Sequence, residues 1–479
     1  MARIVVETLA TDASPAALLR RLAGEPEPAA LDSSAPDLRD ERYSVLAAAP
    51  IRTLTCREGV LTDGDGARLA EGADAFAALE RAFASVRAVR PAGAGPYLPG
   101  WIGYVGYEMA RCIERLPGRA RRDTALPDLR LALYDAVAVH DARTGSWRLI
   151  RLVFDTPPRG AGRGERILRR LAATTPDEAT GSPDVDAIAA VRPAAHAESP
   201  FTAGGYRRAV AQCVAHIAAG DVFQVNLSQR LTVAAPVAPI DLYLALRRRN
   251  PAAYAAYLAF ESDERSCAVL SSSPELFLRL RGRRVVTRPI KGTRRRGGDL
   301  GADARAAAEL RASEKDNAEL AMIVDLLRND LGRICEYGSI RVVEPNRLEA
   351  HPTVFHLVAT VAGRLRGDVG PAALLRATFP GGSITGAPKI RAMEIIDDLE
   401  PTARGPYTGC IGYVGVDGTC TWNIAIRTIV WQEGLAHVQV GGGIVADSNP
   451  AAEHQETLDK ARAMLEALHQ VVRGQEVPR

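Results

Sequence analysis

The segment 202–233 places the strongest constraint on how this chain can fold. A helix is predicted from Thr202 to about Ala219, because its pattern stops at Gly220. An alternating strand, VFQVNLSQRLTV (222–233), follows directly. Helices and strands then alternate to the C-terminus without a detectable internal repeat, which indicates one large unit of mixed secondary structure over about 199–475.

The first 155 residues show a different pattern. Short β-type runs at 3–7, 43–46, 131–134 and 147–153 are separated by Gly, Pro and Asp turns, and one helix is predicted near 76–86. Residues 156–198 are rich in Pro, Gly, Ala, Thr and charge, which is typical of a connector with room for one short helix. We therefore divide the chain into 1–155, 156–198 and 199–475.

Composition excludes several classes of protein. Of the 479 residues, 47% are hydrophobic, enough for a sizeable core, and 60 Lys and Arg against 57 Asp and Glu leave a net charge of only +3. The protein therefore has no strong overall electrostatic field that would attract nucleic acid or a membrane surface. The seven cysteines lack CxxC spacing, there is no signal-peptide pattern, and no run of about 18 apolar residues occurs. We expect a cytoplasmic protein with reduced thiols and no cysteine metal site.

Two acidic pairs fall at helical spacing. Asp316 and Glu319 share a face of one predicted helix, and Glu453 and Glu456 share a face of another. If the fold brings the helices together, the pairs offer hard oxygen ligands for Mg²⁺. The alternative is that acids in a first helical turn simply complement the helix dipole. Lys460, four residues after Glu456, has the spacing of an ordinary surface partner.

Two glycine-rich segments, 379–389 and 440–445, are candidates for anion binding. Consecutive glycines let backbone N–H groups approach a carboxylate or phosphate, although either segment could be an ordinary turn. Neither has the Walker spacing. Arg427 falls on a strand predicted over 422–430, where a buried charge needs either a protein carboxylate or a bound one.

The stretch RPIKGTRRR (288–296) contains one lysine, Lys291, ahead of three arginines. Lys291 stands between a proline-restricted strand end and Gly292, and it is either a surface charge or a reactive amine. Arg294 to Arg296 are expected to form a solvated run.

Nine ordered segments resemble the chorismate-utilising enzymes over about 199–470. They are GDVFQVNLSQR (220–230), SSSPELFL (271–278), RPIKGTRRRG (288–297), AELAMIVDLLRNDLGR (318–333), VFHLVATVAGRL (354–365), FPGGSITGAPKIRAMEII (379–396), YTGCIGYVG (407–415), WNIAIRTIV (422–430) and GGGIVADSNPAAEHQETLDKA (441–461). The N-terminal LDSS (31–34), DERYSVLAAAP (40–50) and GWIGYVGYE (100–108) resemble the N-terminal region of the aminating members, where anthranilate synthases keep a tryptophan site. The resemblance implies an α/β (α+β type) fold with two face-packed β-sheets flanked by helices, and Mg²⁺-bound chorismate at their junction.

The resemblance also implies site roles. Glu319 and Glu456 would be direct Mg²⁺ ligands, with Asp316 and Glu453 holding metal-bound water. The implied catalytic residues are Glu275, the general acid for the leaving 4-hydroxyl, and Lys291, the nucleophile. The implied substrate-binding residues are Arg427, Tyr407, His356, Gln224, Thr385, Gly386, Gly441, Gly442, Gly443 and Lys460. Asp316 departs from the glutamate common at its position.

Two positions distinguish members of the family. Water-adding members have a lysine base where this chain has Gln224, and glutamine cannot abstract a proton at neutral pH, so isochorismate formation is disfavoured. At 291, PIKGT resembles the aminodeoxychorismate synthase branch, whereas anthranilate synthases have alanine. The implied reaction is Mg²⁺-dependent amination of chorismate to 4-amino-4-deoxychorismate, the first step toward 4-aminobenzoate and folate.

The nitrogen source would lie outside this chain. No glutaminase-type nucleophile motif occurs, so a separate glutamine amidotransferase subunit is expected to supply ammonia. Two alternatives remain open at this point. One is an anthranilate synthase component I, which eliminates pyruvate, and the other is an inactive chorismate- or tryptophan-binding regulatory module.

Overall fold

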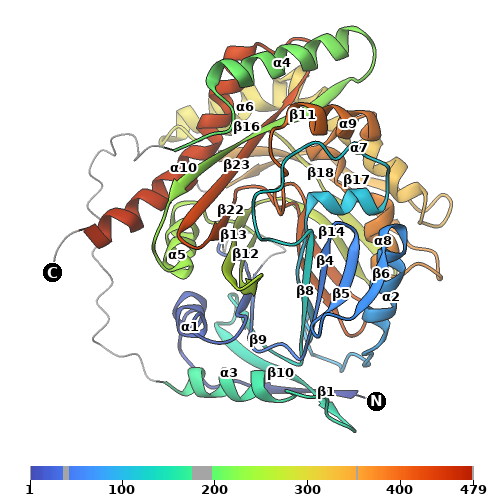
Figure 1. Ribbon diagram of the computed structural model, residues 1–479, viewed down its shortest axis with the longest axis vertical. Helices are drawn as coiled ribbons and strands as arrows, with labels where there is room; N and C mark the ends of the chain where they lie inside the picture. Colours follow the sequence, from blue (N-terminus) through green and yellow to red (C-terminus); the bar gives the residue numbers. More distant parts are fainter. Residues whose placement is uncertain (1, 36–41, 175–196, 352–353, 477–479) are drawn as a thin grey trace.

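Two large antiparallel sheets form the body of the protein (Figure 1). The computed structural model describes residues 2–35, 42–174, 197–351 and 354–476. The first sheet contains, in spatial order, β1 (Ala2–Thr8), β10 (Ser146–Phe154), β9 (Ala136–Asp141), β3 (Tyr43–Ala47), β2 (Ala29–Asp32), β12 (Tyr254–Ser262), β13 (Arg265–Ser273), β22 (Thr428–Gln432), β23 (Leu435–Ile444), β11 (Gln224–Ala234) and β19 (Gly386–Ala387).

The second sheet has the order β16 (Ile290–Arg295), β18 (Val354–Arg364), β15 (Arg284–Arg288), β14 (Leu276–Arg281), β21 (Cys420–Asn423), β20 (Cys410–Gly415), β7 (Gly100–Val105), β8 (Leu129–Tyr134), β4 (Arg52–Arg57), β5 (Val60–Asp63) and β6 (Arg68–Glu71), with β17 (Arg341–Ala350) also paired to β18. A core of inward-facing residues from both sheets, including Tyr104, Val139 and Val269, joins them face to face. The predicted architecture of two packed sheets is confirmed.

Helices cover the outer faces of the sheets. On the first sheet lie α1 (Pro15–Leu22), α3 (Arg163–Ala173), α5 (Pro239–Arg249) and α10 (Pro450–Glu476), whose apolar sides share one cluster with its strands. The second sheet is covered by α2 (Ala75–Ala84), α7 (Glu314–Gly332) and α8 (Pro371–Thr378), with α6 (Leu300–Ala312) beside β16 and β18. In contrast, α4 (Ala203–Ala218) and α9 (Lys389–Leu399) lie against β11 of the first sheet. Figure 1 shows α2 and α8 on the side opposite α1 and α3.

The capping signals read from the sequence determine where the site helices begin. The Ser313 hydroxyl accepts from the backbone N–H of Asp316 at 3.2 Å at the start of α7, and Asn449 Oδ1 accepts from the first-turn N–H groups of α10, which begins at Pro450. Asp316 and Glu453 therefore lie in the first turns of their helices, and Glu319 and Glu456 lie one turn later.

Strands from both predicted regions share the two sheets. β2 pairs with β12 in the first sheet, and β7 pairs with β20 in the second. The short helix expected within the connector is α3, whereas residues 175–196 lie outside the described residues. The boundaries at 155 and 199 stay a prediction from sequence composition.

The strand predicted over 422–430 is wrong. β21 ends at Asn423 in the second sheet, and β22 begins at Thr428 in the first sheet. Residues 424–427 carry the chain from one sheet to the other, and Arg427 has a positive φ of 49°. Ile424 packs in the outer cluster of the second sheet and Ala425 in the core between the sheets, so both are buried as they would be in one continuous strand. Apolar patterning alone does not separate these two cases.

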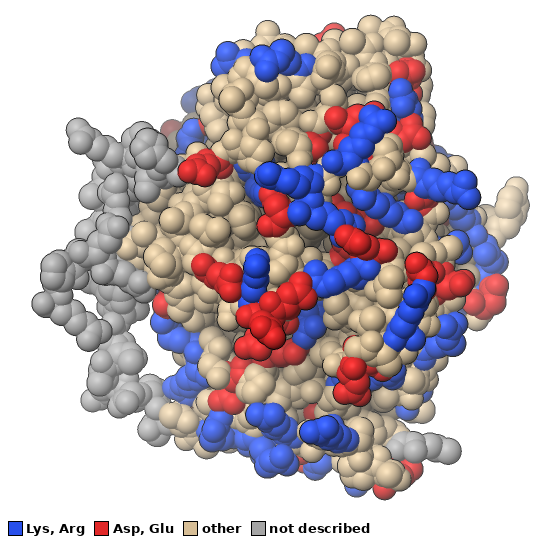
Figure 2. Space-filling model, in the orientation of Figure 1, with Lys and Arg blue, Asp and Glu red and all other residues tan. Residues whose placement is uncertain are grey.

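Within the described ranges, no helix is both long enough and apolar enough to span a membrane. Figure 2 shows basic and acidic side chains interspersed over one face of the molecule, in agreement with the near-balanced charge of the sequence.

Candidate active site

The glycine run of β23 lies beside the first turns of α10. A Cβ atom at Gly442 would stand 3.2 Å from Glu453 Oε2 and 3.6 Å from Glu456 Oε1, so glycine leaves room for these carboxylates against the strand. Lys460 Nζ lies 2.7 Å from Glu456 Oε1 and donates to the Gly441 carbonyl at 2.8 Å. The pairing of Lys460 with Glu456 is therefore present, and it lies at the edge of the glycine run.

Gln224, at the start of β11, faces the same glycines. A Cβ atom at Gly443 would stand 2.5 Å from Gln224 Nε2. The Gln224 side chain is buried, and neither of its amide atoms has a hydrogen-bond partner among the residues that the structure describes. On the other edge of β11, Asn226 N donates to the Thr385 carbonyl at 2.8 Å, and Gly386 passes so close that a Cβ there would be 2.1 Å from Gln224 O. An unpartnered buried amide is costly unless a ligand satisfies it.

Glu275 lies just before β14 and is buried. Ser383 Oγ donates to its Oε1 at 2.7 Å. Burial raises the pKa of Glu275 to about 7, although the Ser383 hydrogen bond and the cations of Lys291 and Arg427 oppose the rise. A carboxyl group with this pKa is partly protonated at neutral pH and can donate a proton.

Lys291 lies on β16, and its ammonium group interacts electrostatically with Glu319 and Glu275. Its Nζ is 3.5 Å from the Ser383 carbonyl, and burial lowers the pKa of Lys291 while Glu319 and Glu275 oppose that change. Gly292 has a φ of 68°, and a Cβ atom there would lie 3.0 Å from the Asp316 side chain. Glycine at 292 therefore serves both the left-handed backbone and the close approach of α7.

The acids of α7 and α10 surround this lysine. Glu319 from α7 and Glu456 from α10 both interact electrostatically with the Lys291 ammonium, and Lys315 of α7 interacts with Glu453 and Glu456. Within the described part of the chain, no three His, Cys, Asp or Glu side chains gather as a ready metal cluster. The donor chemistry nevertheless fits Mg²⁺, because two helices present carboxylate oxygens toward one lysine and a glycine strand.

His356 and Arg427 lie in the same region. His356 Nδ1 is 3.0 Å from Thr293 Oγ1, and its buried Nε2 has no hydrogen-bond partner within the described part of the chain. Burial, with the nearby Arg427 charge and His351, lowers the pKa of His356 to about 3, so the ring is neutral. Arg427 donates to Asn250 Oδ1 at 3.3 Å, and burial lowers its pKa. No carboxylate among the described residues forms an ion pair with Arg427, which leaves its charge available to an anionic ligand.

Tyr407 lies in the turn before β20. It is buried, burial raises the pKa of its hydroxyl, and the Arg404 guanidinium carbon is 5.9 Å from its ring centroid. Thr408 N donates to the Ala425 carbonyl at 2.8 Å, which attaches this turn to the crossing segment that carries Arg427. The structure thus attaches the turn that carries Tyr407 to the segment that carries Arg427, while the Tyr407 ring itself lies near Arg404.

The arginines after Lys291 are not simply solvated. Arg294 donates to Glu309 at 2.7 Å and to Asp316 at 3.2 Å, and Arg296 pairs with Asp303. Arg295 and Arg296 are exposed and Arg294 is partly exposed, so the run is solvated as expected. In addition, α6 and α7 fold back over β16 and supply acids for Arg294 and Arg296 that the linear sequence does not place beside them.

Known proteins of similar sequence show the family to which this chain belongs. Residues 34–466 match the family model described as chorismate binding enzyme. The chain belongs to this family. It is 41% identical over 440 residues to anthranilate synthase component 1 of Thermus thermophilus, covering 91% of both chains. It is 38% identical over 437 residues to aminodeoxychorismate synthase component 1 of Bacillus subtilis, covering 90% of both.

Solved structures of the family agree with the fold. Anthranilate synthase component I from Streptococcus pneumoniae superimposes with a TM-score of 0.74 at 30% identity, covering 90% of this chain and 93% of the other. The menaquinone-specific isochorismate synthase of Escherichia coli, at 18% identity and a TM-score of 0.69, covers 98% and 94% and shares the fold. The chain is thus a chorismate-utilising enzyme, and the choice among family reactions rests on individual residues.

Proposed function

We propose that this enzyme aminates chorismate to 4-amino-4-deoxychorismate, using ammonia from a separate glutamine amidotransferase subunit. The observation that carries the proposal is Lys291, an amine with a lowered pKa beside Glu275, a carboxyl group with a raised one. Both pKa shifts favour the neutral form of the group. A neutral lysine amine can act as a nucleophile, and a protonated carboxyl group can donate a proton. The name component 1 carried by the relatives is consistent with a second subunit.

The reaction follows from these two groups. Glu275 protonates the departing 4-hydroxyl, which leaves as water, while the neutral Lys291 amine adds to C2 and the ring double bonds shift. Ammonia then adds at C4, and the Lys291–C2 bond breaks to return the neutral amine. The ammonium group formed at C4 loses one proton, which restores the acid form of Glu275. The enolpyruvyl group stays attached. Ser383 holds Glu275 toward this centre through its 2.7 Å hydrogen bond.

Substrate and metal would be held by the surrounding elements. Arg427, Tyr407 and the backbone N–H groups of the β23 glycines would bind the substrate carboxylates. The remaining positions that would line the site are His356, Gln224, Thr385, Gly386 and Lys460. Mg²⁺ would be held directly by Glu319 and Glu456, and through water by Asp316 and Glu453, and would supply positive charge opposite a substrate carboxylate.

A second candidate is anthranilate synthase component I. The 41% identity to the Thermus thermophilus enzyme favours it, since that relative is slightly more similar than the aminodeoxychorismate synthase. Both reactions would use the same acids. They differ in the position of the amino group, which is C2 in anthranilate and C4 in 4-amino-4-deoxychorismate, and in whether pyruvate is eliminated.

Product analysis decides between them. Purified protein with chorismate, Mg²⁺ and ammonium at alkaline pH should give a product with the mass of chorismate in which one hydroxyl is replaced by an amino group, without pyruvate. Anthranilate with an equal amount of pyruvate would instead establish the second candidate. Glutamine should support no turnover until an amidotransferase subunit is added, and glutamine-dependent product from this chain alone would contradict the assignment of the nitrogen source.

Lys291 is tested by trapping. With chorismate and Mg²⁺ but no ammonia, intact-protein mass spectrometry should detect an addition equal to chorismate minus water, mapped to Lys291 by peptide analysis. Lys291→Ala should lose the adduct and, because covalent catalysis is removed, turn over about 100-fold more slowly. Arg295→Ala, a change in the same strand at an exposed side chain, is the matched control and should form the adduct normally. An unchanged rate in Lys291→Ala would show that the lysine is not the nucleophile.

A further inference from the structure

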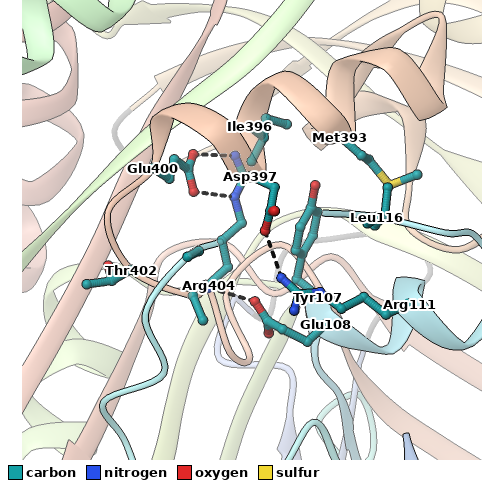
Figure 3. A pocket seen from close by; sticks show the side chains of 12 residues that line it. Tyr107, Glu108, Arg111, Leu116, Met393, Ile396, Asp397, Glu400, Thr402 and Arg404 are labelled. Atoms are coloured by element: carbon teal, nitrogen blue, oxygen red, sulfur yellow. Dashed lines mark hydrogen bonds and ion pairs between the residues drawn. The ribbon is translucent and has the colours of Figure 1, made fainter. Parts of the chain in front are cut away.

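Arg404, a fully buried arginine, lies behind the glycine-rich loop 379–389 and takes no part in the proposed reaction. Arg404 and its partner Glu400 have side chains that are 1% and 3% exposed. A small cavity between α9 and η2 (Tyr107–Cys112) adjoins them, and Figure 3 shows Glu108, Tyr107 and Arg404 converging there. Burying a charge pair this deeply is costly, and a well-packed apolar pair often gives equal stability, so the pair calls for a reason other than stability.

All five N–H donors of the Arg404 guanidinium are used. Nε and Nη2 donate to the two oxygens of Glu400 at 2.9 and 2.6 Å. Nη1 donates to the Ile384 carbonyl at 3.2 Å and to Thr408 Oγ1 at 3.1 Å, and Nη2 also donates to the Asn226 carbonyl at 2.6 Å. Such a planar fork fixes its partners in both distance and direction.

These partners belong to three separate walls of the candidate site. Ile384 follows Ser383, the hydroxyl that holds Glu275. Asn226 lies on β11 opposite Gly443 and two residues from Gln224. Thr408 follows Tyr407 directly. One guanidinium therefore sets the spacing between the glycine-rich loop, the strand beside the β23 glycines and the tyrosine turn.

The N-terminal region holds this arginine in place. Glu108 on η2 accepts from Arg404 N and from Gly405 N, both at 2.9 Å. The Tyr107 ring lies against the guanidinium, with 4.6 Å between its centroid and Cζ. Ser228 on β11 completes the network, because its N–H and hydroxyl both donate to Glu400.

We propose that Arg404 is a positioning residue that holds the three walls of the chorismate site in register, and that Glu108 fixes Arg404 from the N-terminal region. The inference rests on the proposed function in treating loop 379–389, β11 and the turn at Tyr407 as walls of the chorismate site. Chorismate consumption and loop mobility test it whichever product forms.

The test compares two buried arginines. Arg404→Lys keeps a positive charge beside Glu400 but loses the directed bonds to Ile384 and Asn226. Because displacement of reacting groups by about 1 Å can cost on the order of 100-fold in rate, kcat/KM for chorismate with saturating ammonium should fall by about that factor. Hydrogen exchange of peptide 379–389, followed by mass spectrometry, should become faster.

The matched control is Arg230→Lys. Arg230 is 7% exposed, lies on β11 like Asn226, and forms a two-point ion pair with Asp123. Among the described residues, its side chain donates to Asp123 and not to loop 379–389 or the turn at Tyr407. It should lose a similar amount of thermal stability and keep kcat/KM and loop exchange unchanged. Equal losses of kcat/KM in both variants, or unchanged loop exchange in Arg404→Lys, would overturn the proposal.

A milder variant covers the case in which Arg404→Lys does not fold. Glu108→Gln leaves the guanidinium intact and replaces one of the two backbone acceptors with an amide nitrogen. It should show the same combination of faster loop exchange and lower kcat/KM, with a loss of about tenfold. Normal exchange and normal kcat/KM in this variant would remove Glu108 from the proposal and, with it, the link to the N-terminal region.

Discussion

Glu275→Gln should lower kcat by about 10² to 10⁴-fold, the usual range for loss of a general acid. The amide keeps the size of the side chain and can still accept from Ser383 Oγ, but it cannot deliver a proton to the departing hydroxyl. In the wild-type enzyme the acid must be protonated, so kcat/KM should fall as pH rises above about 7, the pKa that burial gives Glu275. Glu275→Gln should lose this alkaline limb. A pH–rate profile for both proteins measures the effect.

Two controls separate this role from a structural one. The Ser383 hydrogen bond lowers the pKa of Glu275, so Ser383→Ala should move the alkaline limb to higher pH while retaining most activity at pH 6. Asp135 is another buried carboxyl group with a raised pKa, located in the N-terminal region, and Asp135→Asn should leave the profile unchanged. An alkaline limb that persists in Glu275→Gln would show that another group is the acid.

Glu319→Gln and Glu456→Gln should each abolish turnover at ordinary Mg²⁺ concentrations, with at least about a 100-fold loss. Mg²⁺ gives up bound water reluctantly and needs anionic ligands to compensate, so an amide at either position weakens binding. Titration calorimetry with Mg²⁺ and activity measured against Mg²⁺ concentration would both show the change, and the calorimetry does not depend on turnover.

The same two helices offer matched controls. Asp325 on α7 and Asp459 on α10 are 72% and 50% exposed, and each forms an ion pair with an arginine three residues later in its own helix. Asp325→Asn and Asp459→Asn should therefore bind Mg²⁺ normally. If Glu319→Gln and Glu456→Gln bind Mg²⁺ as tightly as the wild type, the acids of these helices are not metal ligands and instead complement the helix dipoles.

The elements of the site could be predicted from sequence because their signals are local. A serine cap and a first-turn proline place the acidic pairs of α7 and α10, and the spacing within each pair fixes their shared face. Gly292 and Gly386 stand where the chain needs a positive φ or a close approach, which glycine alone tolerates readily. Such features depend on a few neighbouring residues.

Contacts between distant segments could not be predicted in this way. Arg404 looks like a surface arginine in TARGPY, yet it is buried by η2, almost 300 residues earlier, whose Glu108 accepts from its backbone. The crossing at 424–427 has the apolar pattern of a strand because both sheets bury it. Glu400 and Arg404 at i and i+4 were the available signal, but that spacing also describes an ordinary exposed pair.

The N-terminal region contributes strands to both sheets and therefore cannot be removed without exposing strands of the remaining chain. β2 covers one edge of β12, and β7 covers one edge of β20, so a chain that began after the connector would carry two uncovered strand edges in its core. Exposed edges of this kind template pairing between molecules and lead to aggregation. The N-terminal region is therefore not a detachable regulatory module. Changes in regulation would have to come from substitutions within it, since exchanging the whole region would leave the catalytic strands without their neighbours.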